Sequence, residues 1–227
     1  MKSILIVFLL TCFTVAPSHA QDWANLNHFK NENAQIGLPD SSESRVVFMG
    51  NSITEGWGVK NPSFFSDKPY INRGISGQTT PQMLLRFRAD VIDLKPAVVI
   101  ILAGTNDIAG NTGPSTLKMI MDNIVSMTEL ALANDIKVVL SSVLPAYNYF
   151  WKPELEPAEK IVELNKMIKA YADKKGIVYV DYFTQMADDK NGLKEKYTDD
   201  GVHPNIAGYK VMAPLAEEAI GKVLIQE

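Results

Sequence analysis

The sequence predicts an α/β fold in which helices cover both faces of a parallel β-sheet. Short apolar runs typical of strands alternate with longer segments of helical character, and this alternation favours parallel pairing. The clearest strand, residues 97–103 (AVVIILA), is apolar throughout, as expected for a strand buried on both faces. Each polar motif that could carry chemistry follows a predicted strand or starts a predicted helix. Parallel sheets of this kind bind ligands beyond the carboxyl ends of their strands, which is where these motifs lie.

The first twenty residues have the features of a secretory signal peptide. Lys2 precedes an apolar run over residues 4–10, and residues 18–20 (SHA) have the small-x-small pattern of a cleavage site. The segment is too short to span a bilayer. We therefore expect an exported protein, periplasmic or extracellular, with a single domain over residues 21–227. An uncleaved N-terminal helix and a lipid anchor at Cys12, in a loose lipobox match, are the alternatives.

The composition excludes several functional classes. Cys12 is the only cysteine, so the folded domain has no free thiol, intrachain disulfide or Cys-ligated zinc site. Outside the signal peptide the histidines are His28 and His203, far apart in sequence, which argues against a His-rich metal site. The formal net charge is −4 and no block of Lys and Arg is present, which argues against a nucleic-acid partner.

The predicted elements follow one another along the chain without a linker or an internal repeat. Residues 21–43 are polar and are interpreted as an N-terminal helix or arm that lies on the domain. Apolar spacing and composition then predict the other elements. These are strands over 45–49, 69–72, 97–103, 137–143 and 177–180, and helices over 80–94, 115–134, 157–175 and 205–224.

A serine and a histidine are the candidate reactive pair. A hydrolase working near neutral pH usually needs an imidazole. His203 is the candidate base, because Asp200 lies three residues before it and a turn would let that carboxylate orient the ring. Ser52 is the candidate nucleophile, since it follows Gly50 at a tight strand-to-helix turn. A solvated turn before a helix, and a serine that only caps a helix, are the alternatives.

Two further motifs offer hydrogen-bond donors. Gly77 follows the second strand, and a glycine there can bring its backbone N–H close to a ligand. Asn106 follows the buried third strand, and its amide is a neutral, fixed donor suited to an oxyanion. The alternatives are an ordinary loop glycine and an Asx turn or helix cap made by Asn106 or Asp107.

Taken in order, the four motifs resemble the four sequence blocks of the SGNH, or GDSL-type, esterase and lipase superfamily. The blocks are GNS at 50–52, the segment containing Gly77, GTN at 104–106 and DGVH at 200–203. The resemblance implies a flavodoxin-like, three-layer α/β/α sandwich with a central parallel sheet of about five strands. It also implies that no metal or cofactor is used.

The same resemblance implies a role for each site residue. Ser52 would be the nucleophile, His203 the base and Asp200 its partner. The N–H groups of Ser52 and Gly77 and the side chain of Asn106 would form the oxyanion hole. Gly74 lies in the same block as Gly77, but the form Ser-Gly-x-Thr favours Gly77. The sequence departs from the family's common form immediately before the nucleophile, where asparagine at position 51 replaces aspartate.

Aromatic residues are the candidate substrate contacts. Tyr147, Tyr149 and Trp151 follow the fourth strand, and Trp57 follows Ser52. They could stack on a sugar ring or line an acyl channel, or equally form a hydrophobic plug. Since no long apolar lid is evident, we expect an exported serine esterase for short acyl groups on glycans or lipids. A non-hydrolytic glycan- or lipid-binding protein and an acyltransferase are the alternatives, and nothing in the sequence predicts an oligomeric state.

Overall fold

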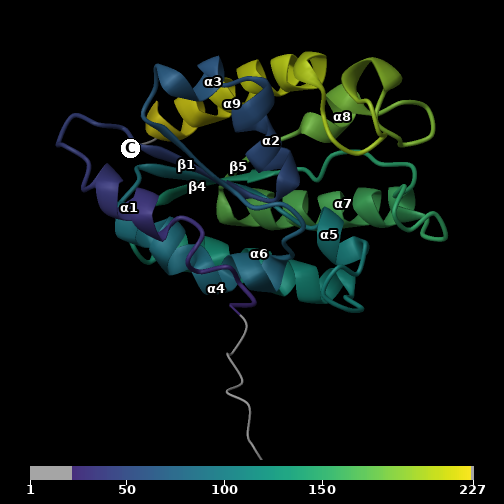
Figure 1. Ribbon diagram of the computed structural model, residues 1–227, viewed down its shortest axis with the longest axis horizontal. Coiled ribbons are helices and arrows are strands. Elements are labelled where there is room, and N and C mark those ends of the chain that lie inside the picture. Colours follow the sequence, from purple (N-terminus) through teal and green to yellow (C-terminus); the bar gives the residue numbers. More distant parts are fainter. Residues whose placement is uncertain (1–21, 226–227) are drawn as a thin grey trace, which may run out of the picture.

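A central sheet of five parallel strands organises the computed structural model, which describes residues 22–225 (Figure 1). The predicted signal peptide, with Cys12, lies outside the described residues. The strand order is β2-β1-β3-β4-β5, as in flavodoxin-like folds. No helix within the described range has the length and apolar character needed to cross a membrane. The strands are β1 (Val46–Gly50), β2 (Tyr70–Gly74), β3 (Val98–Leu102), β4 (Lys137–Ser141) and β5 (Val178–Val180).

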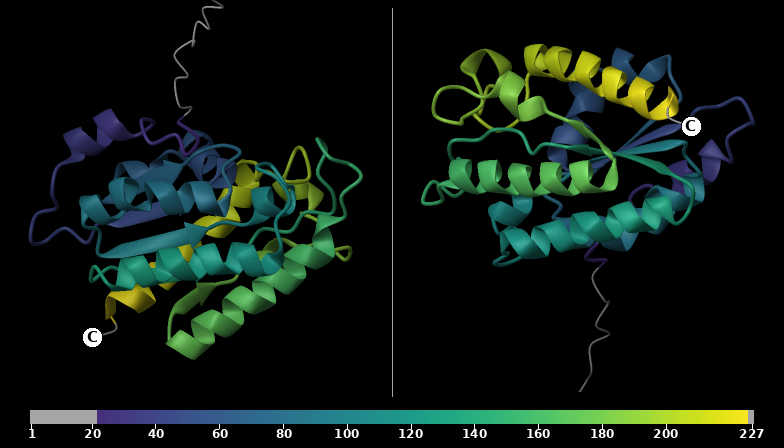
Figure 2. Two further views of the ribbon diagram at one scale, coloured as in Figure 1. Left: turned by 90° about the horizontal axis from the view of Figure 1, so that it is seen from below. Right: turned by 180° about the vertical axis from the view of Figure 1, so that it is seen from behind.

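Helices pack on both faces of the sheet, so the predicted three-layer sandwich is confirmed (Figure 2). Successive strand residues point to opposite faces. Val47 and Met49 therefore contact the layer of α4, α6 and α7, whereas Val46 and Phe48 contact the layer of α2, α3, α8 and α9. The helices are α2 (Ser52–Lys60), α3 (Ser63–Ser66), α4 (Thr80–Asp90), α6 (Leu117–Leu132), α7 (Pro157–Lys175), α8 (Tyr182–Met186) and α9 (Ile206–Ile225).

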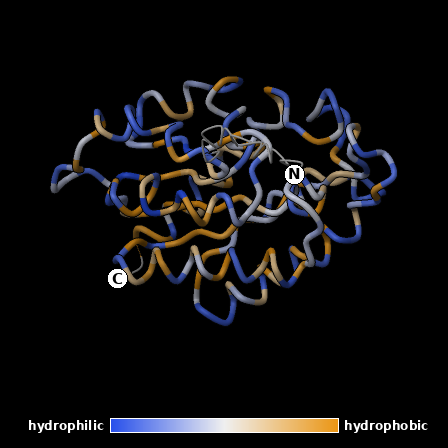
Figure 3. The backbone as a smooth tube through the Cα atoms, turned by 60° about the horizontal axis from the view of Figure 1, so that its bottom comes forward, coloured by the Kyte–Doolittle hydropathy of each residue, from blue (hydrophilic) through white to orange (hydrophobic). Residues whose placement is uncertain are grey.

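The distribution of hydropathy follows these layers. Apolar segments run through the middle of the backbone trace, and hydrophilic segments gather in the outer loops (Figure 3). All five residues of β1 and of β3 are buried. Burial on both faces explains why these two strands read as continuous apolar runs in the sequence.

Several predicted boundaries differ from the structure for local reasons. The helix predicted over 80–94 ends at Asp90, and Ile92–Leu94 forms a separate 3-10 turn that ends at Lys95 with φ 47°. The closing helix continues through Pro214, whose exposed ring faces solvent, where the freed carbonyl can meet water. The short elements α5 (Thr105–Ile108) and the 3-10 turn Glu195–Tyr197 were not predicted.

The N-terminal segment lies on the domain, as the sequence indicated. Its helix α1 (Lys30–Ile36) has no buried residue. The fully buried Arg73 of β2 holds it in place, because the guanidinium donates to Asn33 Oδ1 and to Glu32 Oε1 and lies 4.4 Å from the centre of the Phe29 ring. Polar contacts therefore attach this segment to the edge strand of the sheet.

The strand order brings three loops together at one edge of the sheet. In the parallel register Gly50 pairs with Gly74 on one side and with Leu102 on the other. The chains leaving β1, β2 and β3 therefore start next to one another. The predicted functional residues Ser52, Gly77 and Asn106 lie on these three exits.

Candidate active site

Ser52 is the first residue of α2, directly after a buried turn. Asn51 caps the helix, since its Oδ1 accepts from Ile53 N at 3.0 Å, and Asn51 itself is fully buried. Gly50 is required for packing rather than for an unusual backbone angle. A Cβ at position 50 would lie 2.0 Å from Thr54 Oγ1 and 3.1 Å from the Leu102 carbonyl. The turn thus fits tightly between α2 and β3.

A chain of hydrogen bonds joins the three residues predicted for the triad. Ser52 Oγ lies 2.9 Å from His203 Nε2, and His203 Nδ1 lies 2.7 Å from Asp200 Oδ2. The other carboxylate oxygen, Oδ1, accepts from Val202 N at 2.9 Å and from His203 N at 2.7 Å. Gly201, with φ 83°, closes the turn that makes this possible. The Asp200 carboxylate therefore reaches the imidazole of its own segment.

The ionisation state of Asp200 determines which nitrogen of the His203 imidazole carries the proton. Partial burial raises the pKa of the Asp200 carboxyl, but the hydrogen bonds from His203 N, Val202 N and the imidazole outweigh it and hold that pKa below its ordinary value. An ionised carboxylate only accepts hydrogen bonds, so Nδ1 of His203 carries the proton. Nε2 is then the acceptor that faces the Ser52 hydroxyl.

Three donors lie at the exits of β1, β2 and β3. In the described part of the chain, neither Ser52 N nor Gly77 N donates to a protein acceptor. Gly77 has φ 77°, a left-handed conformation that favours glycine, while a Cβ there would meet no atom within 4 Å. Asn106 Nδ2 donates one hydrogen bond to Gln78 O at 2.9 Å, and an amide nitrogen has a second N–H to offer.

Hydrogen bonds also hold these loops against one another. Ile75 N donates to Gly50 O at 3.2 Å, which joins the β2 exit to the end of β1. Asn111 Nδ2 donates to Gly77 O at 3.2 Å from the loop after β3. The Gly77 loop is thus fixed from both sides, between the serine-bearing turn and the asparagine-bearing turn.

An open pocket of about 390 Å³ lies over Ser52 and His203. One face of α2 lines it, because Ser52, Glu55, Gly56, Val59 and Lys60 recur at helical spacing. That spacing is the signal by which the sequence could have identified Glu55 and Lys60 as pocket residues. Ser76, Asp200, His203 and Tyr209 complete the lining.

The predicted aromatic contacts separate into buried and accessible residues. The burial of Trp57, 2% exposed and stacked on Phe64 at 4.5 Å, contradicts the expectation that its ring contacts substrate. Tyr149 is likewise fully buried and hydrogen-bonds Thr105, so the same expectation is wrong for it. Both are core residues, as the plug alternative described.

Two of the four aromatic residues remain accessible. Trp151 is half-buried, stacks on Tyr149 at 4.9 Å, and has its ring centre 6.5 Å from that of His203. Tyr147 is 58% exposed, and Lys190 Nζ lies 6.0 Å from its ring centre. Trp151 is therefore the aromatic residue of this loop that borders the site.

Fold and site together define a class of protein. A serine, a histidine and an aspartate linked by hydrogen bonds, beside backbone N–H groups that have no acceptor in the described part of the chain, form the arrangement by which serine hydrolases act. The sequence model of the GDSL-like Lipase/Acylhydrolase family matches residues 48–211. The chain belongs to this family, as the four motifs predicted, and is a carboxylic ester hydrolase.

Known relatives have the same class of activity in their names. The chain is similar to the structure of a GDSL-like lipase from Bacteroides thetaiotaomicron, with 51% identity, a TM-score of 0.86, and 88% of this chain and 98% of that one covered. It is 26% identical to an acetylxylan esterase of Xylanibacter ruminicola over 82% of this chain, which spans only 45% of that longer protein. It is 27% identical to the esterase TesA of Pseudomonas aeruginosa, over 73% of this chain and 78% of TesA.

Proposed function

We propose that the protein is a serine esterase that removes short acyl groups, such as acetyl, from carbohydrates. The observation that carries the proposal is the hydrogen-bonded chain Ser52–His203–Asp200 beside the N–H groups of Ser52 and Gly77, which donate to no acceptor among residues 22–225. A nucleophile, a base with its orienting carboxylate, and donors for an oxyanion are the parts that acyl transfer needs.

The reaction proceeds in two acyl transfers. Ser52 Oγ attacks the ester carbonyl carbon while His203 Nε2 takes the hydroxyl proton, and the same imidazole then protonates the departing alcohol. This step leaves the acyl group on Ser52. A water molecule attacks the acyl-enzyme with His203 again as base, which releases the carboxylic acid and restores the Ser52 hydroxyl. Asp200 stays ionised and stabilises the imidazolium in each step.

Negative charge develops on the carbonyl oxygen in both transition states. Ser52 N, Gly77 N and the free N–H of Asn106 Nδ2 are the donors for this oxygen. Donors fixed by the fold need little reorganisation as the charge appears, which is why such groups lower the barrier. The positive end of α2, whose first residue is Ser52, adds to the same effect.

The charged and polar side chains in the pocket lining favour a hydroxyl-rich alcohol over a long aliphatic chain. Glu55, Lys60 and Ser76 place charged or polar groups around the space next to Ser52. The half-buried ring of Trp151 offers a flat surface beside His203 on which a sugar can stack. The acetylxylan esterase among the relatives supports acetyl groups on a carbohydrate as the substrate class.

Two substitutions test the mechanism. Ser52→Ala and His203→Ala should each lower kcat by a factor on the order of 10⁶, while the proteins keep their thermal midpoint. His28→Ala is the matched control, since His28 is the other histidine among residues 22–225 and is exposed. A fluorophosphonate should add to Ser52 in the wild type and leave Ser52→Ala unlabelled in intact mass spectra. More than about a tenth of the wild-type activity in His203→Ala would refute the assignment.

The substrate class is tested with matched esters and one matched pair of variants. We expect kcat/KM to be higher for acetylated xylo-oligosaccharides than for 4-nitrophenyl esters of long fatty acids. Trp151→Ala should weaken the oligosaccharide reaction more than the 4-nitrophenyl acetate reaction. Phe150→Ala, which removes the neighbouring ring that is 60% exposed, should change neither by more than about threefold. A preference for long-chain esters would overturn the substrate assignment and leave the mechanism intact.

We also propose that the protein acts outside the cytoplasm. The support is the sequence alone, namely the apolar run of residues 4–10 and the cleavage pattern at Ser18-His19-Ala20. The expected result is a mature N-terminus at Gln21 in the exported protein. N-terminal sequencing separates this outcome from a lipid-modified N-terminus at Cys12, which would show retention in the membrane fraction instead.

A further inference from the structure

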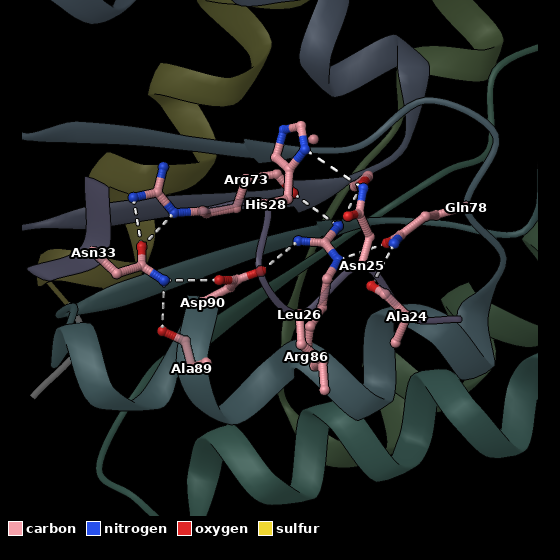
Figure 4. A network of polar contacts seen from close by, with 12 residues as sticks. Ala24, Asn25, Leu26, His28, Asn33, Arg73, Gln78, Arg86, Ala89 and Asp90 are labelled. Carbon is pink, nitrogen blue, oxygen red and sulfur yellow. Dashed lines mark hydrogen bonds and ion pairs between the residues drawn. The ribbon is translucent and has the colours of Figure 1, made fainter. Parts of the chain in front are cut away.

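A buried arginine, Arg86, lies at the centre of a network of polar contacts (Figure 4). Arg86 of α4 is fully buried, and its three nitrogens all donate hydrogen bonds. Nη1 donates to Asp90 Oδ2 at 3.0 Å, and Nη2 donates to the carbonyl oxygens of Gly50 at 2.9 Å and of Arg73 at 3.0 Å. A buried guanidinium with this set of partners fixes their relative positions, since any displacement leaves a buried polar group unpaired.

Two of these partners end the strands that lead to the site. Gly50 is the last residue of β1 and lies two positions before Ser52, and Arg73 precedes Gly74 at the end of β2. One guanidinium therefore holds together the carbonyls from which the serine-bearing turn and the Gly77 loop begin. The proposed mechanism uses both segments but gives no role to the arginine beneath them.

Gln78 connects this network to the oxyanion donors. Its side chain is 3% exposed; Oε1 accepts from Arg86 Nε at 2.5 Å, and Nε2 donates to Ala24 O at 2.8 Å. Its main-chain carbonyl accepts from Asn106 Nδ2 at 2.9 Å, and the residue before it is Gly77. Gln78 thus follows one of the three donors in sequence and accepts a hydrogen bond from another, and both polar atoms of its side-chain amide are hydrogen-bonded.

The N-terminal segment closes the network from the outside. Besides the contact from Gln78 to Ala24, Asn33 Nδ2 donates to Asp90 Oδ1 at 2.8 Å, which holds the carboxylate that pairs with Arg86. This segment comes before β1 in the chain and supplies none of the proposed reactive groups. Its contacts nevertheless reach the side chain that adjoins Gly77.

We propose that Gln78, held between Arg86 and the Ala24 carbonyl, is a positioning residue for the oxyanion hole. The inference rests on the proposed function, because it assumes that Gly77 N and Asn106 Nδ2 stabilise the oxyanion. Gln78 acts through these two donors and does not itself touch the substrate. A displacement of about 1 Å in catalytic geometry can cost on the order of 100-fold in rate. Loosening Gln78 therefore lowers kcat rather than substrate binding.

The first test compares two variants that both loosen the N-terminal segment. Gln78→Met has a similar length and removes the contacts to Arg86 and Ala24, and it should lower kcat by about 10- to 100-fold with KM within about threefold. Asn33→Ala is the matched control. It removes the contacts to Arg73 and Asp90 from the same segment but none to Gln78. It should lower the thermal midpoint while kcat stays within about twofold of wild type. Equal kcat losses in the two variants would overturn the proposal.

A double-mutant cycle provides a measurement that a purely structural role would not move. If Gln78 acts through Asn106, the factor lost in Gln78→Met should shrink at least threefold in an Asn106→Ala background. Full multiplication of the two effects would contradict the proposal. If Asn106→Ala alone has wild-type kcat, the proposed oxyanion hole fails. If only Gln78→Met has wild-type kcat, the oxyanion hole stands and the positioning role falls.

A conservative variant covers the case in which Gln78→Met does not fold. Gln78→Glu keeps an acceptor for Arg86 Nε, but it replaces the donor to Ala24 O by a second carboxyl oxygen and adds a negative charge that faces the Arg86 guanidinium. We expect its kcat to stay within about tenfold of wild type, again with KM nearly unchanged. A larger loss of kcat, or a change confined to KM, would show that the contact with Arg86 is not what positions the loop.

Discussion

Replacing Asn106 by alanine separates a catalytic role from a structural one. Its side chain is 3% exposed at the exit of β3, and one of its two N–H bonds is occupied by Gln78 O at 2.9 Å. The substitution removes the N–H that remains for an oxyanion and also leaves the Gln78 carbonyl without this donor. Each loss has its own measurable consequence.

The structure sets the size of both effects. Removal of one oxyanion donor costs roughly 2.7–4 kcal/mol of transition-state stabilisation, which corresponds to a decrease in kcat of about 10²–10³. The broken hydrogen bond to Gln78 O costs about 0.5–1.5 kcal/mol of unfolding free energy. Substrate binding in the ground state does not depend on the oxyanion donor, so KM should change little.

The assay is steady-state kinetics on a short acyl ester together with urea denaturation of the same preparations. We expect Asn106→Ala to unfold at a slightly lower urea midpoint and to lose more than about 100-fold in kcat. A variant that is destabilised but fully active per folded molecule would refute the reasoning. Asn106 would then be only the buried tie to the Gly77 loop.

Three further predictions concern the buried residues Asn51 and Asp107 and the effect of a metal chelator. Asn51→Asp should keep the cap on Ile53 N, because only the Nδ2 position changes, and Nδ2 has no partner among the described residues. The variant's kcat/KM should stay within about tenfold of wild type. A rise beyond tenfold would contradict a structural role for Asn51. Burial raises the pKa of Asp107 from 3.8 to about 6, so the folded state binds its proton more tightly than the unfolded chain does. The resulting contribution to stability is fully present below pH 3.8 and is lost as the pH rises through 6, a change of no more than about 3 kcal/mol. Asp107→Asn should remove this pH dependence. Urea unfolding of both proteins at pH 4 and pH 7 measures the difference. Activity should be unchanged by EDTA, and a loss restored by a divalent cation would overturn the metal-free mechanism.

The sequence predicted the strands and long helices well because their signals are local. The apolar run of β3 and the helical spacing of α7 each extend over enough residues to be read directly, and α7 has the predicted bounds. The one-turn helices α3 and α5 were not predicted, since four residues hold no full period of a helical pattern. Their position depends on packing against other segments.

The same distinction applies to the site. Ser52, Asp200 and His203 could be identified because each lies in a short turn whose residue types suggest its chemistry. The Arg86–Gln78 network could not, because arginine on a helix is usually exposed. A signal was present in α4, where Arg86 and Asp90 share the helical spacing of the buried Met83 and Phe87.

The aromatic residues show a limit of reasoning from proximity in sequence. Trp57 lies five residues after Ser52, but the turn of α2 points its ring into the sheet, where it stacks between Phe64 and Tyr209. Trp151 lies about a hundred residues from the nucleophile and yet borders His203. Only the packing of α2 and of the loop after β4 distinguishes the two tryptophans.

The long separation between the serine and the histidine makes catalytic activity depend on a contact between distant parts of the chain. Ser52 and His203 are 151 positions apart, and a second hydrogen bond joins the neighbouring parts of the chain, since the Tyr209 hydroxyl donates to Ile53 O at 2.8 Å. Contacts between segments so distant in the chain form slowly, because the intervening loop must be ordered first. A partly folded chain that has already assembled β1 to β3 carries the nucleophile without its base. Recovery of activity during refolding should therefore require the segment that carries His203 to dock against α2, in addition to formation of the sheet.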